Sequence, residues 1–164
     1  SFDPVVCQFG IMFFPDKAKA FAEFARVLRP GGTLVFTVWD SLEQNRVADI
    51  SQKTIASFFE KDPPDFLTVP FGFHKIEPNR KLIDGAGLSV TRIQTVSTVI
   101  ERPDSTSIAR GFVEGNPGIL QIRQRGVADP EDIIQAVARA ILDEYGPEPV
   151  RIPLHEITFE ALKP

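Results

Sequence analysis

Residues 5–39 read VVCQFGIMFFPDKAKAFAEFARVLRPGGTLVFTVW and decide the fold of this chain. Residues 5–9 form a short apolar run, which predicts a strand that is buried on both faces. Residues 33–39 are almost wholly apolar or β-branched and predict a second buried strand. Between the two strands, residues 17–29 have the periodicity of an amphipathic helix. A strand, a helix and a strand in this order predict two parallel strands joined by a right-handed crossover.

Both ends of the predicted helix carry recognisable signals. Asp16 stands where its carboxylate can cap the first turn. Pro30-Gly31-Gly32 predicts the end, because proline cannot continue a helix and glycine tolerates a left-handed exit. The expected buried stripe of the helix consists of Ala18, Phe21, Ala22, Ala25 and Leu28.

The rest of the chain predicts two more strands and several helices. Helical patterns cover residues 43–60, 75–85, 108–113 and 129–146, and strand patterns cover residues 88–100 and 150–162. An aromatic and proline-rich loop is expected over residues 61–74. The order is β-α-β, a helical insertion, β, a helical insertion and β, which predicts an α/β sheet of four strands.

Composition narrows the function classes. The chain has 164 residues, of which 43% are hydrophobic and 24% charged, as in an ordinary globular domain. The net charge of −4 and the scattered 18 Lys and Arg argue against a nucleic-acid partner. The single cysteine, Cys7, excludes an internal disulfide and suits a reducing compartment, so we expect a cytoplasmic protein. No apolar run is long enough for stable membrane insertion. One Cys and two His cannot form a closed zinc site without acidic ligands, so no metal is expected.

Two sequence blocks resemble a known family. The first is SFDPVVCQFG (residues 1–10) with FFPD (residues 13–16), and the second is RVLRPGGTL (residues 26–34). In this order and spacing they resemble the "FD-x-V … F-x-D … RVL-x-PGG-x-L" passage of class I S-adenosylmethionine-dependent methyltransferases. The closest group is the ubiquinone/menaquinone-biosynthesis type that acts on small molecules. Residues 82–88 and 158–164 resemble the approaches to its sixth and seventh strands.

The resemblance implies the C-terminal part of a Rossmann-like methyltransferase sheet. The predicted strands would be its fourth to seventh, with the last antiparallel and with helical insertions. The family's glycine-rich cofactor turn and its ribose-binding acid find no counterpart here. The chain also starts at Ser1, beside a strand-like run. We therefore expect residues 1–164 to be the C-terminal portion of one methyltransferase domain, with the cofactor-binding half absent and the chain alone inactive.

The family's cofactor lies against the carboxyl end of the fourth strand. The resemblance therefore assigns S-adenosylmethionine to Cys7, Gln8, Phe9 and Gly10. The Gln8 amide is the most informative of these, because an amide in an apolar strand needs hydrogen-bond partners. Aromatic and neighbouring side chains at the same rim and in the loops predict a substrate pocket. Its expected members are Met12, Phe13, Phe14, Trp39, Phe71, Phe73, His74 and Phe112.

Polar candidates for catalysis are few. His74 could act as a general base if the acceptor is a hydroxyl, and its alternative is a solvent-facing loop histidine. Asp40 could orient a substrate or form a turn, and Arg110 and Asn116 are weaker pocket candidates. His155 lies within the last predicted strand and suits a structural role. Methyl transfer needs mainly proximity and orientation, so a dedicated catalytic residue need not exist.

The predicted function is methyl transfer from S-adenosylmethionine to a small, apolar or aromatic acceptor. A homo-oligomer is compatible with this function. Two alternatives stay open: a degenerate methyltransferase-like module that binds a protein partner through the edge of its first strand, and another doubly wound α/β enzyme, such as a nicotinamide-dependent reductase.

Overall fold

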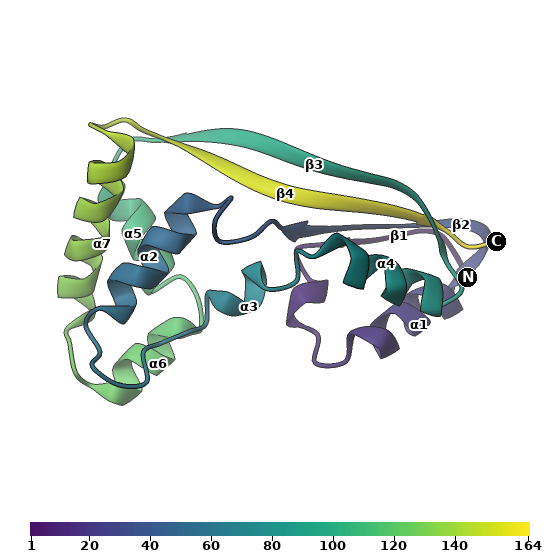
Figure 1. Ribbon diagram of the computed structural model, residues 1–164, viewed down its shortest axis with the longest axis horizontal. Helices are drawn as coiled ribbons and strands as arrows, with labels where there is room; N and C mark the ends of the chain where they lie inside the picture. Colours follow the sequence, from purple (N-terminus) through teal and green to yellow (C-terminus); the bar gives the residue numbers. More distant parts are fainter. The chain divides into compact units, whose positions relative to one another are not determined.

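The computed structural model describes residues 1–164 as two compact units (Figure 1). We call the first the sheet unit; it consists of Ser1–Ser41, Val69–Ser97 and His155–Pro164. The second, the helical unit, consists of Leu42–Thr68 and Thr98–Leu154. Two long strands, β3 (Ser89–Arg102) and β4 (Val150–Leu162), contribute residues to both units. None of the helices combines the length and apolarity that a bilayer crossing needs.

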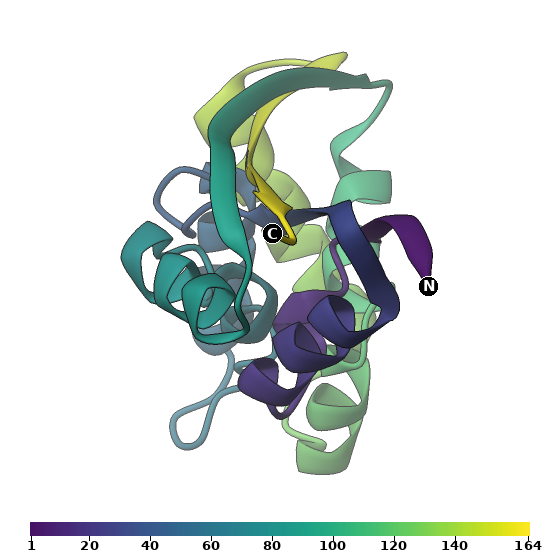
Figure 2. The same ribbon diagram turned by 90° about the vertical axis from the view of Figure 1, so that its right-hand side faces the viewer.

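The sheet has four strands in the order β1-β2-β4-β3. Strand β1 (Phe2–Gln8) runs parallel to β2 (Leu28–Trp39), and β2 runs antiparallel to β4. Figure 2 shows this order, from the purple β1 through the dark blue β2 and yellow β4 to the teal β3. The prediction of a four-stranded α/β sheet with an antiparallel last strand is confirmed. β1 and β3 are the two edges.

One face of the sheet packs against helices. The 3-10 helix η1 (Ile11–Phe13), α1 (Lys17–Val27) and α4 (Ile76–Gly85) bury their apolar residues against β1, β2 and β4. The centre is aromatic: the rings of Phe36 and Phe159 stack with centroids 4.7 Å apart and planes at 4°. The ring of Phe21 from α1 meets Phe36 edge-on at 5.3 Å. This face carries the hydrophobic core of the unit.

The other face of β1 is open, so the prediction that residues 5–9 are buried on both faces is wrong. Val5 and Cys7 pack on the core, but Val6 is 68% exposed and Gln8 is exposed. Phe2 is 60% exposed. The reason is topological, because β1 is an edge strand and the helices cover only the face that carries the alternate residues.

Helix α1 is shorter than predicted and its stripe is narrower. Phe21 and Ala25 are buried, but Ala18 and Ala22 are exposed. The helix ends at Val27 and β2 begins at once, so Pro30-Gly31-Gly32 lies within the strand.

A contact from the far end of the sequence explains this early end. The Lys163 ammonium donates to the carbonyls of Ala25 and Leu28 at 2.6 and 2.7 Å. The backbone N–H of Gly31 donates to the Lys163 carbonyl at 2.8 Å. Backbone pairing with the C-terminal segment therefore begins at Gly31, directly after the proline, and the Lys163 side chain reaches back to the end of α1. A local pattern reveals neither contact.

The helical unit contains the predicted helices in modified form. They are α2 (Arg46–Ala56), α5 (Ser105–Val113) and α7 (Pro130–Tyr145). In α7 the Asp129 carboxylate accepts from the backbone N–H of Glu131, and Ile133, Ile134, Val137, Ala138 and Ile141 are buried. Helix α2 is shorter than residues 43–60.

Two short helices were not predicted. Helix α6 (Gly118–Arg125) begins within Asn116-Pro117-Gly118, a sequence typical of a loop. Helix α3 (Thr68–Phe71) lies within the predicted aromatic loop. Both are too short for a clear amphipathic pattern.

Candidate functional site

Strand β1 ends in a left-handed residue. Phe9 has φ of +51°, a conformation that costs a non-glycine residue free energy. Its backbone N–H donates to the Thr37 carbonyl of β2 at 3.0 Å, which fixes the turn. Backbone strain of this kind concentrates at functional sites.

The rings of Phe9, Trp39 and Phe71 form an aromatic stack. The Phe9 and Trp39 centroids are 4.2 Å apart with planes at 21°, and the Trp39 and Phe71 centroids are 6.0 Å apart with planes at 29°. Phe9 follows β1 and Trp39 ends β2, so the stack lies at the carboxyl ends of two adjacent parallel strands. Open α/β sheets bind their ligands at this edge. Phe9 and Trp39 are half-buried, and Phe71 is buried.

The segment after Phe71 is held by side-chain hydrogen bonds. The Nδ1 atom of His74 lies 2.8 Å from the Phe71 carbonyl oxygen. The buried Asn79 side chain donates through Nδ2 to the carbonyls of Phe73 and Lys75, both at 3.0 Å. The Lys17 ammonium lies 5.1 Å from the centre of the Phe73 ring, a cation–π contact. Residues 71–75 therefore have one defined conformation beside the aromatic stack.

The four residues that the sequence assigned to the cofactor lie in different environments. Cys7 is half-buried and packs on the core, whereas the Gln8 side chain is exposed. A Cβ on Gly10 would lie 3.0 Å from the Cys7 sulfur, so a larger residue there would be crowded. Phe9 joins the predicted pocket residues Trp39 and Phe71 in one stack. Their role towards a cofactor stays a prediction.

The predicted pocket residues that follow β1 lie in different environments. Met12 is 2% exposed and belongs to the core, while Phe13 is largely exposed. The Phe14 ring packs at 6.4 Å from that of Phe24. Together with residues of α1 they line an open, shallow groove of about 340 Å³. The structure thus brings Trp39 into contact with Phe71 and Phe71 into contact with His74, and it leaves Phe13 and Phe14 at the surface.

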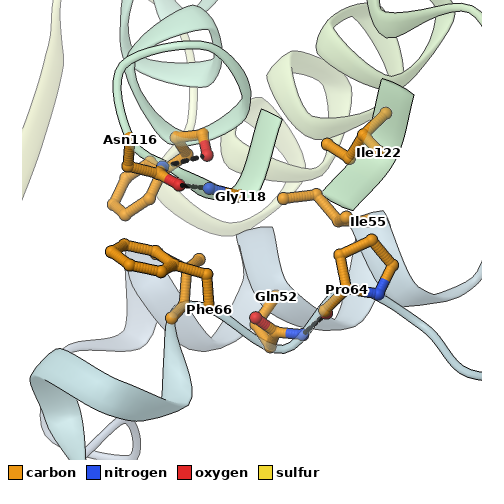
Figure 3. Close-up of a pocket in the computed structure, with 9 residues that line it drawn as sticks. Gln52, Ile55, Pro64, Phe66, Asn116, Gly118 and Ile122 are labelled. Atoms are coloured by element: carbon orange, nitrogen blue, oxygen red, sulfur yellow. Dashed lines mark hydrogen bonds between the residues drawn. The ribbon is translucent and has the colours of Figure 1, made fainter. Parts of the chain in front are cut away.

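Phe112 and Asn116 belong to the helical unit. They line a cavity of about 10 Å³, room for one water molecule, between α2, α5, α6 and the Pro64–Leu67 turn (Figure 3). The Asn116 side chain accepts from Gly118 N–H at 2.8 Å and donates to the Phe112 carbonyl at 2.7 Å. Its polar atoms therefore serve the loop that starts α6, which is a structural role.

The remaining polar candidates have structural partners. Arg110 pairs with Glu114 and Glu131, both at 2.9 Å, and hydrogen bonds to the first and then the second raise its pKa. The Asp40 carboxylate accepts from the backbone N–H of Ser41 at 2.7 Å, as in a turn. The Asp40 backbone N–H donates to the His155 carbonyl at 3.0 Å.

The sequence missed two features of the site. The contact between Phe9 and Trp39 depends on the left-handed turn of Phe9, which no residue type signals. The Asn79 side chain donates hydrogen bonds to the carbonyls of both neighbours of His74. The only local sign of this role in the sequence is an Asn in the first turn of a helix.

Comparisons with known proteins agree with this architecture. Residues 1–36 match the family described as "Methyltransferase domain". No functionally curated protein matches the sequence.

Three solved structures illustrate the fold. The protein BH2331 of Bacillus halodurans C-125, assigned to the methyltransferases, superposes with a TM-score of 0.54 at 14% identity, covering 99% of this chain and 64% of its own. The YcgJ protein of Bacillus subtilis gives 0.53 at 19% identity, covering 99% and 64%. A chain of the Haloferax volcanii complex between the Trm112 methyltransferase activator and its partner gives 0.51 at 17% identity, covering 100% and 55%. This chain therefore spans less than two thirds of the length of these structures.

Proposed function

We infer a role in methyl transfer, because residues 1–36 match a methyltransferase family model and the fold matches the C-terminal part of a methyltransferase fold. We propose that it supplies the acceptor-binding side of such an enzyme and that the acceptor is a small apolar or aromatic molecule. The remaining part of the domain would come from residues outside this chain.

The aromatic stack carries the proposal. Trp39 stacks with Phe9 and with Phe71 at the carboxyl ends of β1 and β2, where ligands of open α/β sheets bind. A planar acceptor gains stacking energy of roughly 0.5–1.5 kcal/mol per ring contact, beyond burial of its surface. A sulfonium cation is attracted to the same ring faces.

The residues present fit one end of S-adenosylmethionine. Gln8 offers an exposed amide, Phe9 an aromatic face and Gly10 a backbone without a side chain, all at the end of β1. These groups suit the methionine and sulfonium part. The chain has no glycine-rich turn and no matching acid for the adenosine part, which supports a second half outside it. When bound, the cofactor supplies an activated methyl group.

The chain's own residues then act by binding and orientation. The stack holds the acceptor at a fixed angle, and the segment 71–75 limits its movement and excludes water. Fixing two reactants in an attack geometry can lower the barrier by roughly 7–11 kcal/mol. This contribution requires rigid side chains more than a dedicated catalytic group.

Calorimetry with S-adenosylhomocysteine tests the proposal. The titration is made with this chain and with the full-length protein that carries it. Binding by the full-length protein, together with transfer of labelled methyl from S-adenosylmethionine to an aromatic acceptor, is the expected result. No binding and no transfer by either would contradict the proposal.

The open edge of β1 favours a second candidate function. Phe2 and Val6 are exposed beside the unpaired backbone of an edge strand, which suits a module that pairs with another protein chain. Sedimentation at increasing concentration tests it: self-association that β1 substitutions abolish, with no cofactor binding, would favour this function over methyl transfer.

A further inference from the structure

His74 has one ring nitrogen engaged and one available. Its Nδ1 atom lies 2.8 Å from the Phe71 carbonyl oxygen. A carbonyl oxygen only accepts hydrogen bonds, so Nδ1 carries the proton in this contact. In the neutral ring the other nitrogen, Nε2, therefore holds a lone pair and is a proton acceptor. No protein group hydrogen-bonds to Nε2.

The position of the ring is fixed from both sides. Asn79, which is fully buried, holds the carbonyls of Phe73 and Lys75, the two neighbours of His74. The ring itself is attached to the backbone of Phe71, whose side chain is the outer member of the aromatic stack. His74 is half-buried. These hydrogen bonds fix the backbone and the ring of His74 more firmly than a histidine in an exposed loop would need.

We propose that His74 is the general base of this site and that the acceptor is a hydroxyl group on an aromatic ring. The inference rests on the proposed function and names its substrate class. In this proposal the aromatic stack binds the ring of the acceptor, and Nε2 accepts the proton of its hydroxyl group.

The step balances without a further reactant. An acceptor oxygen lone pair forms the bond to the methyl carbon, and the carbon–sulfur bond of the sulfonium donor breaks with its electron pair going to sulfur. The hydroxyl proton moves to Nε2 of His74, which becomes an imidazolium and returns the proton to solvent after the product leaves. The aryl hydroxyl thereby becomes an aryl methyl ether.

A hydroxyl acceptor needs a general base more than an amine acceptor does. A neutral phenol is a weak nucleophile, and removing its proton during attack contributes typically 10²–10⁴-fold. A neutral amine attacks through a lone pair that it already has, so its proton can leave later. A fixed neutral imidazole beside aromatic rings therefore fits an aryl hydroxyl better than an amine.

The tautomer can be observed directly. The chain has two histidines, so a long-range ¹H–¹⁵N spectrum of the imidazoles contains two rings, and His74→Asn identifies one of them by its disappearance. We expect the neutral His74 ring to carry its proton on Nδ1. A proton on Nε2 would overturn the proposal, because Nε2 could then not accept one.

Activity of the full-length protein gives the second readout, with hydroxylated benzenes as acceptors and the matching anilines for comparison. The Asn side chain of His74→Asn can still donate to the Phe71 carbonyl, so the fold should be kept while the base is lost. We expect methylation of the hydroxyl acceptor to fall at least about 100-fold and that of the aniline to change less than about threefold.

The outcomes separate the two claims. A wild-type enzyme that methylates hydroxylated benzenes while His74→Asn keeps its rate would overturn the base alone. A wild-type enzyme that methylates only anilines would overturn the acceptor class and the base. A full-length protein without any methyl transfer would overturn the proposed function, and the base with it.

Discussion

The ring of Phe9 lies on the ring of Trp39 with centroids 4.2 Å apart, although the two residues are thirty positions apart in the sequence. The contact exists because Phe9 adopts a left-handed conformation at the end of β1 and Trp39 ends the neighbouring parallel strand. A strained residue thus completes an aromatic surface at the carboxyl ends of β1 and β2, the edge where open α/β sheets generally bind ligands.

Two substitutions of Phe9 should separate its strain from its ring. Both Phe9→Gly and Phe9→Ala remove the ring, but only glycine is relaxed at φ +51°. We expect the free energy of unfolding of Phe9→Gly to exceed that of Phe9→Ala by about 1 kcal/mol in urea denaturation. An alanine variant that is equally stable would show that the left-handed turn is not strained in solution.

Tyr145 should titrate abnormally. Burial, and after it the charge of Glu144, raise the pKa of Tyr145 to about 12. Tyr145 is the only tyrosine, so the tyrosinate absorbance near 295 nm reports it alone. At pH 11 we expect about a tenth of it to be ionised in the folded chain and about nine tenths in urea. Equal ionisation in both would contradict the burial.

The sign of the stability effect follows from this shift. The folded pKa lies above the unfolded value near 10, so the folded state keeps its proton where the unfolded state has lost it. The contribution is fully present below pH 10 and is lost as the pH rises towards 12. The slope stays below the limit of about 1.4 kcal/mol per pH unit, because the side chain is half-exposed. In Tyr145→Phe this slope should disappear.

Lys163 should contribute to the stability of the sheet unit. Its ammonium satisfies the carbonyls of Ala25 and Leu28 at the C-terminal end of α1, where a cation also suits the helix dipole. Lys163→Met should lower the free energy of unfolding by about 2 kcal/mol. Lys81→Met, on the exposed side of α4, is the matched control and should change it by less than about 0.5 kcal/mol. Equal effects of the two substitutions would argue against the cap.

Two glycines of the helical unit should respond to alanine in opposite directions. A Cβ on Gly118 would meet the Asn116 oxygen at 2.7 Å, whereas a Cβ on Gly111 meets nothing within 4 Å. Gly118→Ala should therefore destabilise by roughly 1–3 kcal/mol. Gly111→Ala, within helix α5, should stabilise by about 0.5–1 kcal/mol. Thermal unfolding of both variants decides; stabilisation by Gly118→Ala would contradict the packing around Asn116.

The positions of the strands were largely predictable from the sequence, but the burial of their residues was not. Residues 33–39 and 150–162 have clear β composition and form β2 and β4, and Asp129-Pro130 marks the start of α7. The exposure of Val6 could not be inferred from its own segment, because it depends on which strands and helices lie beside β1. The early end of α1 depends on Lys163, more than a hundred residues away.

The site was predicted as a set of residues but not as an arrangement. Trp39, Phe71, Phe73 and His74 were recognisable as aromatic or titratable residues near strand ends. Their grouping depends on a backbone angle at Phe9 and on a buried amide at Asn79, and neither leaves a periodic pattern. Phe13 and Phe14 show the converse, because an apolar residue in sequence proximity to the site can still face solvent.

The fluorescence of Trp39 reports whether the cofactor binds at the aromatic stack. Trp39 is the only tryptophan of this chain, and its emission is isolated by subtracting the signal of Trp39→Phe. S-adenosylhomocysteine is titrated into the full-length protein and binding is followed by calorimetry in parallel. We expect a saturable change in Trp39 emission whose Kd equals the calorimetric Kd. Calorimetric binding that leaves the emission of Trp39 unchanged would contradict it, because the cofactor would then bind away from the aromatic stack.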